Sequence, residues 1–222
     1  MRDDVLFENR TEAGRVLAER VAEFGLVDPV ILALPRGGVP VAAEIAIALG
    51  APLDLVFVRK IGLPRNPEYA VAAVVDGGEP DIVRNDAVIA KGRIGEAYIE
   101  AEARLELQEI ERRRAIYLAG RARADIEGRD LVVVDDGIAT GASVRAALAA
   151  LRRKTQGRLV LAVPVAPKEA LDVMKPLVDD IVCLATPVDF SAVGCFYDDF
   201  HQLTDAEVAR VLDRVEKAAR SA

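Results

Sequence analysis

Two adjacent carboxylates followed by a loop of small residues form the stretch of this sequence that is best suited to chemistry. Residues 131–143 read LVVVDDGIATGAS, in which Asp135 and Asp136 follow four aliphatic residues, and Thr140 and Ser143 supply hydroxyls. The aliphatic run predicts a strand buried on both faces. The loop and the Ala-rich helix expected after it would turn several backbone N–H groups towards one point, which suits a phosphate monoester. Carboxylates would repel that phosphate, so the two acids are better suited to sugar hydroxyls or to a place near a divalent cation.

This stretch resembles the fingerprint of the type I phosphoribosyltransferases, in which four apolar residues and two acids precede a Thr-Gly-x-Ser/Thr loop. In that family the acids hold the ribose hydroxyls of phosphoribosyl diphosphate, and the loop holds its 5-phosphate. The resemblance therefore implies that Asp135 and Asp136 hold the ribose, and that they act on Mg²⁺ only indirectly, through substrate hydroxyls or water. It assigns the 5-phosphate to Ala139, Thr140, Gly141, Ala142 and Ser143.

The competing interpretation of this stretch is a strand, a polar turn and a helix cap without any ligand. A plain turn does not need two acids, a small-residue loop and two hydroxyls in this order. Two other phosphate motifs are missing from the sequence, namely G-x-x-x-x-G-K-[ST] and a G-x-G-x-x-G that follows a strand.

A second strand–glycine–helix unit lies at residues 30–49. The strand predicted at residues 30–34 precedes Arg36, Gly37 and Gly38, and an apolar helical pattern follows. A cation beside a helix N-terminus suits an anion, and the glycines allow close approach of the backbone. In the family that the chain resembles, the corresponding loop binds the diphosphate and often contains a cis peptide bond, so the bond beside Arg36 is the candidate. A structural turn explains this unit equally well when it is considered alone.

Arg59 and Lys60 follow a strand predicted at residues 53–58. Cations at the carboxyl end of a strand of an open α/β sheet would meet a diphosphate leaving group. The pair resembles the basic pair of several type I families, which implies a catalytic role, whereas a solvated strand end is the alternative. Residues 61–69 are rich in glycine and proline and are expected to lack regular structure. The resemblance identifies residues 61–85 as the flexible loop that closes over the reaction.

Residues 86–119 form one long, charged helical pattern with a break expected at Gly92 and Gly95. Its narrow apolar stripe suits packing on the sheet or against a second copy of the chain, which leaves a homodimer open. The three arginines at residues 112–114 lie among many glutamates, so we expect a solvated face rather than a nucleic-acid-binding one.

Alternating strands and helices predict an α/β fold with an open, mainly parallel five-stranded sheet flanked by helices. The strands are expected at residues 30–34, 53–58, 131–134, 158–163 and 180–184. We expect residues 1–222 to form a single phosphoribosyltransferase-like domain. Its parts would be a core at about residues 28–184, the loop and long helix as insertions, and a hood built from the terminal segments, mainly residues 185–222.

The tail gathers four of the ten aromatic residues of the chain. In type I proteins the hood holds the nucleophilic base, and aromatic rings are natural partners for a base. The resemblance thus makes Ile138, Phe190, Phe196 and Tyr197 the candidates for base binding. That these aromatic rings simply anchor the tail on the core has equal weight, because aromatic residues in loops usually pack.

Composition restricts the class of protein. The chain has 222 residues, of which 52% are hydrophobic, and its formal net charge is −7, which does not favour a nucleic-acid-binding surface. Its two cysteines fit a reducing compartment. The polar first residues do not read as a signal peptide, and no apolar run reaches the length of a membrane span, so a cytoplasmic protein is expected.

The resemblance implies transfer of ribose 5-phosphate from 5-phosphoribosyl 1-diphosphate to a nitrogen nucleophile such as a nucleobase, with Mg²⁺ on the donor. In the 6-oxopurine branch the position of Ala139 is an aspartate that handles a proton of the base, so Ala139 argues against hypoxanthine and guanine. Residues 60–68 (KIGLPRNPE) and 190–197 (FSAVGCFY) are most similar to a bacterial branch of predicted phosphoribosyltransferases. The alternative function is a regulatory protein that senses phosphoribosyl diphosphate or a nucleotide without transferring it.

Overall fold

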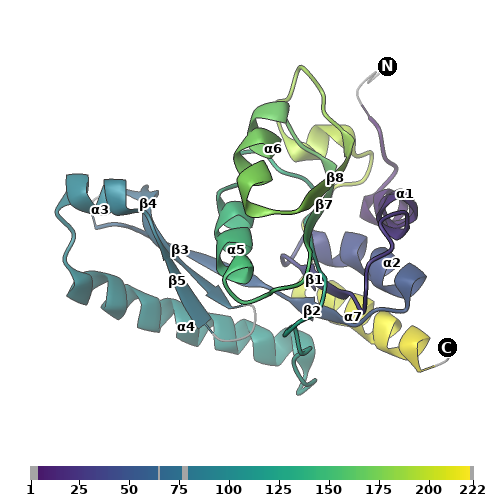
Figure 1. The fold of residues 1–222 in the computed structure, drawn as a ribbon, viewed down its shortest axis with the longest axis horizontal. Coiled ribbons are helices and arrows are strands. Elements are labelled where there is room, and N and C mark those ends of the chain that lie inside the picture. The colour runs from purple at the N-terminus through teal and green to yellow at the C-terminus, as the bar shows by residue number, and fades with distance from the viewer. Residues whose placement is uncertain (1–4, 65, 77–79, 221–222) are drawn as a thin grey trace.

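The computed structural model describes residues 5–64, 66–76 and 80–220, and a parallel sheet lies at its centre (Figure 1). Each pair of neighbouring strands in this sheet is parallel. The order across it is β2 (Leu53–Leu55), β1 (Val30–Ala33), β6 (Leu131–Val134), β7 (Leu159–Val165) and β8 (Asp180–Ala185). The open, parallel five-stranded sheet predicted from the sequence is therefore confirmed.

Strands β1 and β6 lie side by side where the strand order reverses. From β1 the chain crosses to β2 on one side, whereas from β6 it crosses to β7 and then to β8 on the other. The register pairs Ala33 with Val134, so the two strands end at the same level. Loops that leave such a point in opposite directions open a crevice, which is where open α/β sheets bind ligands. The two candidate loops, residues 35–38 and 135–141, both begin at this crevice.

Helices cover both faces of the sheet. One face carries α1 (Arg10–Ala22), α2 (Gly38–Leu49) and α7 (Asp205–Ala219), and the other carries α5 (Ala142–Arg152) and α6 (Lys168–Met174), which continues into the short η1 (Lys175–Leu177). Because side chains alternate along a strand, Ile31 and Ala33 of β1 face the first group of helices, whereas Val30 and Leu32 face the second. Within the described ranges, no helix combines the length and the apolar character that crossing a membrane requires.

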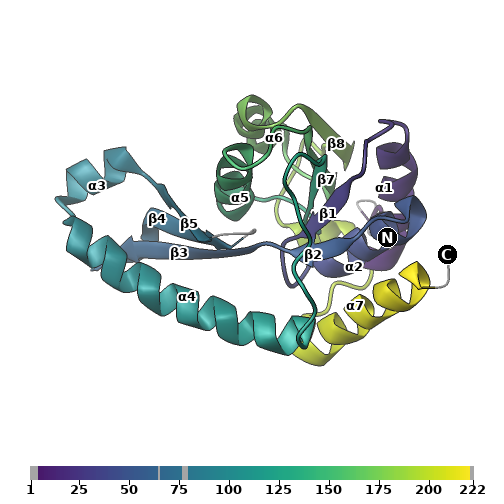
Figure 2. The same cartoon turned by 60° about the horizontal axis from the view of Figure 1, so that its bottom comes forward.

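A second, antiparallel sheet extends away from the core, and together with the two helices that follow it we call it the arm (residues 57–118; Figure 2). Its elements are β3 (Phe57–Leu63), β4 (Asn66–Asp76), β5 (Pro80–Arg84), α3 (Asp86–Gly92) and α4 (Glu96–Leu118). Helix α4 runs along one face of this sheet, and α5 of the core packs on part of the other. The expected break in the long helix is confirmed, since it separates α3 from α4.

The arm corrects two predictions. The strand predicted at residues 53–58 is split between two sheets, because Val56 donates its N–H to Ala33 of the core whereas the next residue already pairs within the arm. Most of residues 61–69 lies in β3 and β4 and is therefore regular, and shifts of register around Gly62 absorb the local irregularity. Residue 65 and residues 77–79 of the predicted flexible loop lie outside the described residues.

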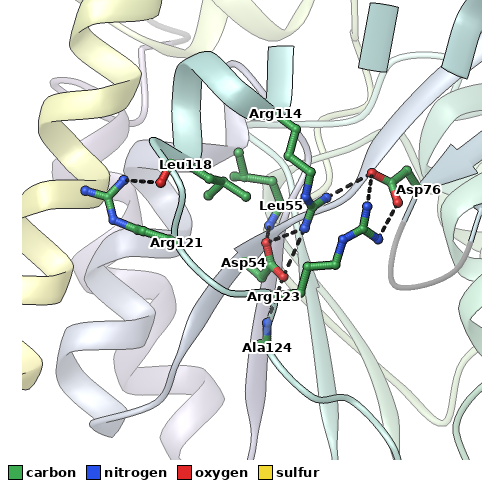
Figure 3. A network of polar contacts seen from close by, with 8 residues as sticks. All are labelled: Asp54, Leu55, Asp76, Arg114, Leu118, Arg121, Arg123 and Ala124. Atoms are coloured by element: carbon green, nitrogen blue, oxygen red, sulfur yellow. Dashed lines mark hydrogen bonds and ion pairs between the residues drawn. The ribbon is translucent and has the colours of Figure 1, made fainter. Parts of the chain in front are cut away.

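A buried group of charges joins the arm to the core (Figure 3). Arg114 of α4 donates from Nη2 to Asp54 of β2 at 3.0 Å and from Nη1 to Asp76 of β4 at 2.9 Å. Arg123 donates to Asp76 at 2.6 Å, and the N–H of Ala124 donates to Asp54 at 3.0 Å. Asp54 and Asp76 are both buried, so their charges depend on these partners.

This network also corrects the expectation of a solvated arginine face. The Arg114 side chain is only 12% exposed. Its neighbours Arg112 and Arg113 do lie on the surface of α4, where both pair with Glu109. One arginine of the three is therefore structural, because a helix turns successive side chains about 100° apart.

The hood covers the start of the loop after β6. It consists of residues 185–203, which include the short η2 (Val193–Phe196), together with Phe7 from the other terminal segment. The two segments are joined by a bridge between Phe7 and Tyr197 and by the N–H of Phe7, which donates to the carbonyl of Phe196 at 3.0 Å. A hood built from both terminal segments is what the resemblance implies.

Candidate functional site

The loop after β1 presses against the acid pair at the end of β6. A Cβ atom on Gly37 would lie 2.0 Å from Oδ2 of Asp136, and one on Gly38 would lie 2.6 Å from the carbonyl oxygen of Val134. Both distances are well below van der Waals contact, so a side chain at either position would force the two loops apart. The glycines therefore bring the two candidate loops into one site.

Arg36 is a cation at the N-terminal end of α2. The peptide bond between Pro35 and Arg36 is cis, and it is one of the two bonds beside Arg36 that the resemblance made candidates. The Arg36 guanidinium lies 3.7 Å from Oδ1 of Asp205 in α7, and Tyr117 of α4 donates its hydroxyl to the same oxygen at 2.7 Å. A separation of 3.7 Å is long for a charge-assisted hydrogen bond, so Arg36 remains able to receive an anion.

The loop after the acid pair leads into a helix that no side chain caps. Gly141 is the N-cap of α5 and has a φ of 70°, a left-handed conformation that favours glycine. A Cβ atom there would also lie 2.4 Å from Cε of Met174. Ala139 and Thr140 are exposed, whereas Ala142 and Ser143 are half-buried. The N–H groups of the first helical turn have no partners within the helix, and together with the helix dipole they make this loop a place for an anion.

The two carboxylates differ in their surroundings. Asp135 accepts a hydrogen bond from the N–H of Asp136 at 2.9 Å. Burial and the adjacent charge of Asp136 raise the pKa of Asp135 well above its usual range. Burial also raises the pKa of Asp136, but the charge of Arg10 and its hydrogen bond oppose that rise. Because a buried carboxylate without a cation favours its neutral form, Asp135 is poised for a ligand that brings hydroxyl donors or positive charge.

Arg10, the first residue of α1, is a site residue that the sequence analysis missed. Its Nε donates to Oδ2 of Asp136 at 2.7 Å, and the two side chains are only 9% and 14% exposed. No local pattern distinguishes it from Arg15 and Arg20, the exposed arginines of the same helix. Its partner lies 126 residues further along the chain, so only the fold reveals the pair.

The aromatic residues of the tail largely anchor the hood. Phe196 and Tyr197 are buried, and the Tyr197 hydroxyl donates to the backbone carbonyl of Asp136 at 2.6 Å. Ile138 is buried as well, and Phe190 packs against Phe196 with the ring centroids 5.3 Å apart. The side chains of Ile138, Phe196 and Tyr197 are thus used in packing, which for the tail aromatic residues is the alternative left open by the sequence, and their assignment to a base stays a prediction.

A cavity of about 360 Å³ lies between the acid pair and the hood. It combines cations and an amide with apolar side chains and a ring. Its lining residues are Arg10, Arg36, Gly37, Asp136, Val193, Phe200, Gln202 and Leu203. Phe200 and Gln202, which the sequence analysis did not select, are therefore better placed than the predicted aromatic residues to contact a ligand beside the acid pair.

The basic pair of the arm does not stand at a strand end. Strand β3 continues to Leu63, and successive side chains of a strand point to opposite faces. Arg59 faces α4, where its Nε lies 2.6 Å from Oε2 of Glu106. Lys60 faces the opposite side and, with Ala142 of α5, lines a second cavity of about 370 Å³ between the arm and the core. The structure therefore separates the two cations that the sequence analysis placed together.

The residues present fit a divalent cation that is held through a substrate. Within the described part of the chain, no group of three or more His, Cys, Asp or Glu side chains could hold a metal ion by itself. At the crevice, Asp136 is already paired with Arg10, whereas Asp135 has no cation partner among the described ion pairs. One carboxylate and the oxygens of a diphosphate match the way in which Mg²⁺ is usually bound beside phosphates.

The single histidine of the chain, His201, lies in the hood, and its pKa can be measured. His201 lies 2.8 Å from Asp199 through Nδ1 and 3.2 Å from Glu207 through Nε2, and these hydrogen bonds raise the pKa of His201 above its usual value. We expect its NMR titration midpoint to lie above about 6.5 in the folded protein and to return towards about 6.5 in urea. Because the pKa is raised by folding, this contribution to stability is present below about pH 6.5 and is lost as the pH rises through the folded value.

Asp199→Asn provides the control for this titration, because it removes the carboxylate whose hydrogen bond contributes most to the raised pKa of His201. The variant should lower the midpoint while Glu207 keeps it from falling fully to the unfolded value. A wild-type midpoint at or below about 6.5 would contradict the described contacts.

Comparison with known proteins gives an independent indication of the family. The model of the phosphoribosyl transferase domain family matches residues 6–198. Rv0571c of Mycobacterium tuberculosis strain H37Rv, provisionally named a phosphoribosyl transferase, is 44% identical over 212 residues, which are 96% of this chain and 47% of that protein. The chain thus spans about half the length of the curated relatives it matches. The crystal structure of TT1426 from Thermus thermophilus is 44% identical, with a TM-score of 0.81 over 94% of this chain and 98% of that one. On these grounds, and with the fold that the resemblance implies, this chain belongs to the phosphoribosyl transferase domain family.

Proposed function

We propose that this domain transfers the ribose 5-phosphate group of 5-phosphoribosyl 1-diphosphate to a nitrogen nucleophile and releases diphosphate. The observation that carries the proposal is the meeting of three parts at the crevice between β1 and β6: a glycine loop with a cation, an acid pair and an uncapped helix N-terminus. A donor of this kind has three matching parts, a diphosphate, two ribose hydroxyls and a 5-phosphate. Membership of the family supports the same donor.

Each loop has a separate role in this proposal. The 5-phosphate binds the loop that leads into α5, through Thr140, Gly141, Ala142 and Ser143, and the ribose hydroxyls donate hydrogen bonds at the acid pair. The diphosphate lies at the N-terminus of α2 beside Arg36, Gly37 and Gly38. Arg59 is left out, since it is turned to α4 and paired with Glu106.

During the transfer, the bond from the anomeric carbon to the diphosphate oxygen breaks, and its electron pair leaves with the diphosphate. A bond from the acceptor nitrogen to the same carbon forms, and the ribose passes through a state with oxocarbenium character. The domain contributes by holding the sugar in place and by neutralising the leaving group with fixed charges and dipoles. The hood excludes water, which would otherwise compete with the acceptor.

Mg²⁺ would neutralise part of the diphosphate charge and would be held mainly by the donor and by water. On the protein side, Asp135 is the carboxylate without a cation of its own among the described ion pairs.

The acceptor in this proposal is a nucleobase-like ring in the cavity under the hood. Phe200 and Val193 offer it apolar contact, and Gln202 offers both a donor and an acceptor of hydrogen bonds. The exposed Ala139 has no group that could exchange a proton with the ring, which speaks against hypoxanthine and guanine. A regulator that bound nucleic acid would need a basic face, and the arginines of residues 112–114 offer little support for one, because all three are paired with acids.

Calorimetric titration with phosphoribosyl diphosphate and Mg²⁺ tests the donor, and a diphosphate-release screen over nucleobases tests the transfer. We expect binding, and release with at least one base. The double variant Asp135→Asn/Asp136→Asn should abolish binding while its circular dichroism spectrum stays that of the wild type.

Three results would count against the proposal. Unchanged donor affinity of the double variant would remove the ribose assignment. Binding without release for any base would support the sensor instead of the enzyme. Lack of binding by the wild-type domain would remove the donor site altogether.

A further inference from the structure

We propose that the two adjacent acids have different tasks: Asp136 is locked to the hood by Arg10, and Asp135 alone faces the ribose hydroxyls. Arg10 is then a positioning residue that acts through Asp136. This inference rests on the proposed function, because it assigns the donor to one member of the acid pair.

Two of the three guanidinium nitrogens of Arg10 donate hydrogen bonds. Nε donates to Oδ2 of Asp136 at 2.7 Å, and Nη1 donates to the backbone carbonyl of His201 at 3.0 Å. The guanidinium also lies over the ring of Phe200, 3.8 Å from its centroid. A single side chain of α1 therefore joins the acid pair to the part of the hood that lines the cavity.

Asp136 lines the cavity under the hood, but its carboxylate is held on two sides. Its carboxylate meets Arg10 and packs against the backbone of Gly37, where even a Cβ atom would not fit. Its backbone carbonyl accepts the hydroxyl of Tyr197 at 2.6 Å. To receive ribose hydroxyls, this carboxylate would have to leave a buried ion pair, which is unfavourable because the guanidinium would remain buried without its partner.

Asp135 has no such ion pair among the described contacts. Its carboxylate accepts one hydrogen bond, from the N–H of Asp136, and among the described ion pairs none involves Asp135. It directly follows β6 and is half-buried at the crevice, beside the backbone of Gly38. An ionised carboxylate can accept several hydrogen bonds, so two neighbouring hydroxyls of one sugar can share it.

The division of tasks predicts that single variants separate two measurements. The first is the calorimetric affinity for phosphoribosyl diphosphate with Mg²⁺, and the second is the hydrogen exchange of the hood backbone at residues 193–203. Asp135→Asn should weaken donor binding on the order of 100-fold, since charge-assisted hydrogen bonds are lost, and should leave hood exchange unchanged. Asp136→Asn and Arg10→Met should weaken donor binding by less than about 10-fold and should accelerate hood exchange.

Further variants exclude a general loss of folding. Arg10→Lys keeps the charge and should restore part of the protection in the hood. Arg15→Met is the matched control, because Arg15 lies on the same helix, is exposed and pairs with Glu44 instead of the acid pair. It should change neither measurement. The double variant Arg10→Met/Asp136→Asn should accelerate hood exchange no more than either single variant, since both remove the same contact.

Two results would overturn the division. One is a loss of donor affinity in Asp136→Asn as large as that in Asp135→Asn, and the other is hood exchange that stays unchanged in both Asp136→Asn and Arg10→Met. If the wild-type domain does not bind the donor, the proposed function fails and the assignment of Asp135 fails with it. Accelerated hood exchange in the Arg10 and Asp136 variants would in that case still identify the Arg10–Asp136 contact as the lock.

Discussion

Arg114→Ala should lower the free energy of unfolding by about 3–5 kcal/mol, because removing one partner of a buried ion pair leaves an uncompensated charge. Arg114 lies between Asp54 of the core sheet and Asp76 of the arm, and all three side chains are at most 12% exposed. Arg123 still neutralises Asp76 in the variant, so the main loss is at Asp54. Urea unfolding followed by circular dichroism measures the change, since the chain has no tryptophan.

Arg112→Ala is the matched control for this prediction. Arg112 stands two positions away on the same helix, and it is 58% exposed and paired with Glu109. Exposed pairs contribute little, so we expect a change within about 0.5 kcal/mol. Equal effects of the two substitutions would show that the network does not join the arm to the core.

Gly37→Ala should weaken donor binding by more than about 100-fold, because positioning within a fraction of an ångström decides binding and catalysis at such sites. The new Cβ would lie 2.0 Å from Oδ2 of Asp136, so the acid pair and the glycine loop would have to move apart. The backbone of Gly37 has a φ of −60° and a ψ of −38°, which any residue adopts. The expected effect is therefore one of crowding alone. Calorimetric titration with phosphoribosyl diphosphate and Mg²⁺ measures it.

Gly50→Ala separates crowding from backbone strain. Gly50 ends α2 at a φ of 60°, and a Cβ atom there would meet nothing within 4 Å. This variant should lose about 1 kcal/mol of stability and keep its affinity for the donor. If Gly37→Ala bound the donor as the wild type does, the contact between the two loops would not be needed for the site.

The central motif could be predicted from the sequence because its signals are local. Four aliphatic residues indicate a buried strand, and the acids and small residues that follow have few other uses in that order. The alternation of strands and helices likewise limits the topology to a parallel sheet, and the structure has one. The cis bond beside Arg36 followed from the resemblance rather than from any local rule.

The remainder of the site depends on contacts between distant segments. Arg10 meets Asp136 only because α1 packs against α2 beside the crevice, and Arg114 meets Asp54 only because α4 returns along the arm. The run at residues 53–58 reads as one strand, yet a change of hydrogen-bonding partner at Val56 divides it between two sheets. The β-strand propensity of a residue does not indicate which neighbouring strand it pairs with. The division of this run between two sheets could therefore not be predicted from the sequence.

The arm leaves and re-enters the core at one place, and this has a consequence for how the fold can vary. Asp54 precedes the departure of the chain into the arm, and its carboxylate accepts the N–H of Ala124 at 3.0 Å, where the chain comes back. The two ends of the arm thus lie beside one side chain, that of Asp54. The five strands of the parallel sheet all come from the chain before and after the arm. Insertions are tolerated where both ends lie close together on a complete host domain. The arm is therefore placed like an insertion in a complete parallel sheet, and its α4 still reaches the crevice, because Tyr117 donates to the same oxygen of Asp205 that faces Arg36.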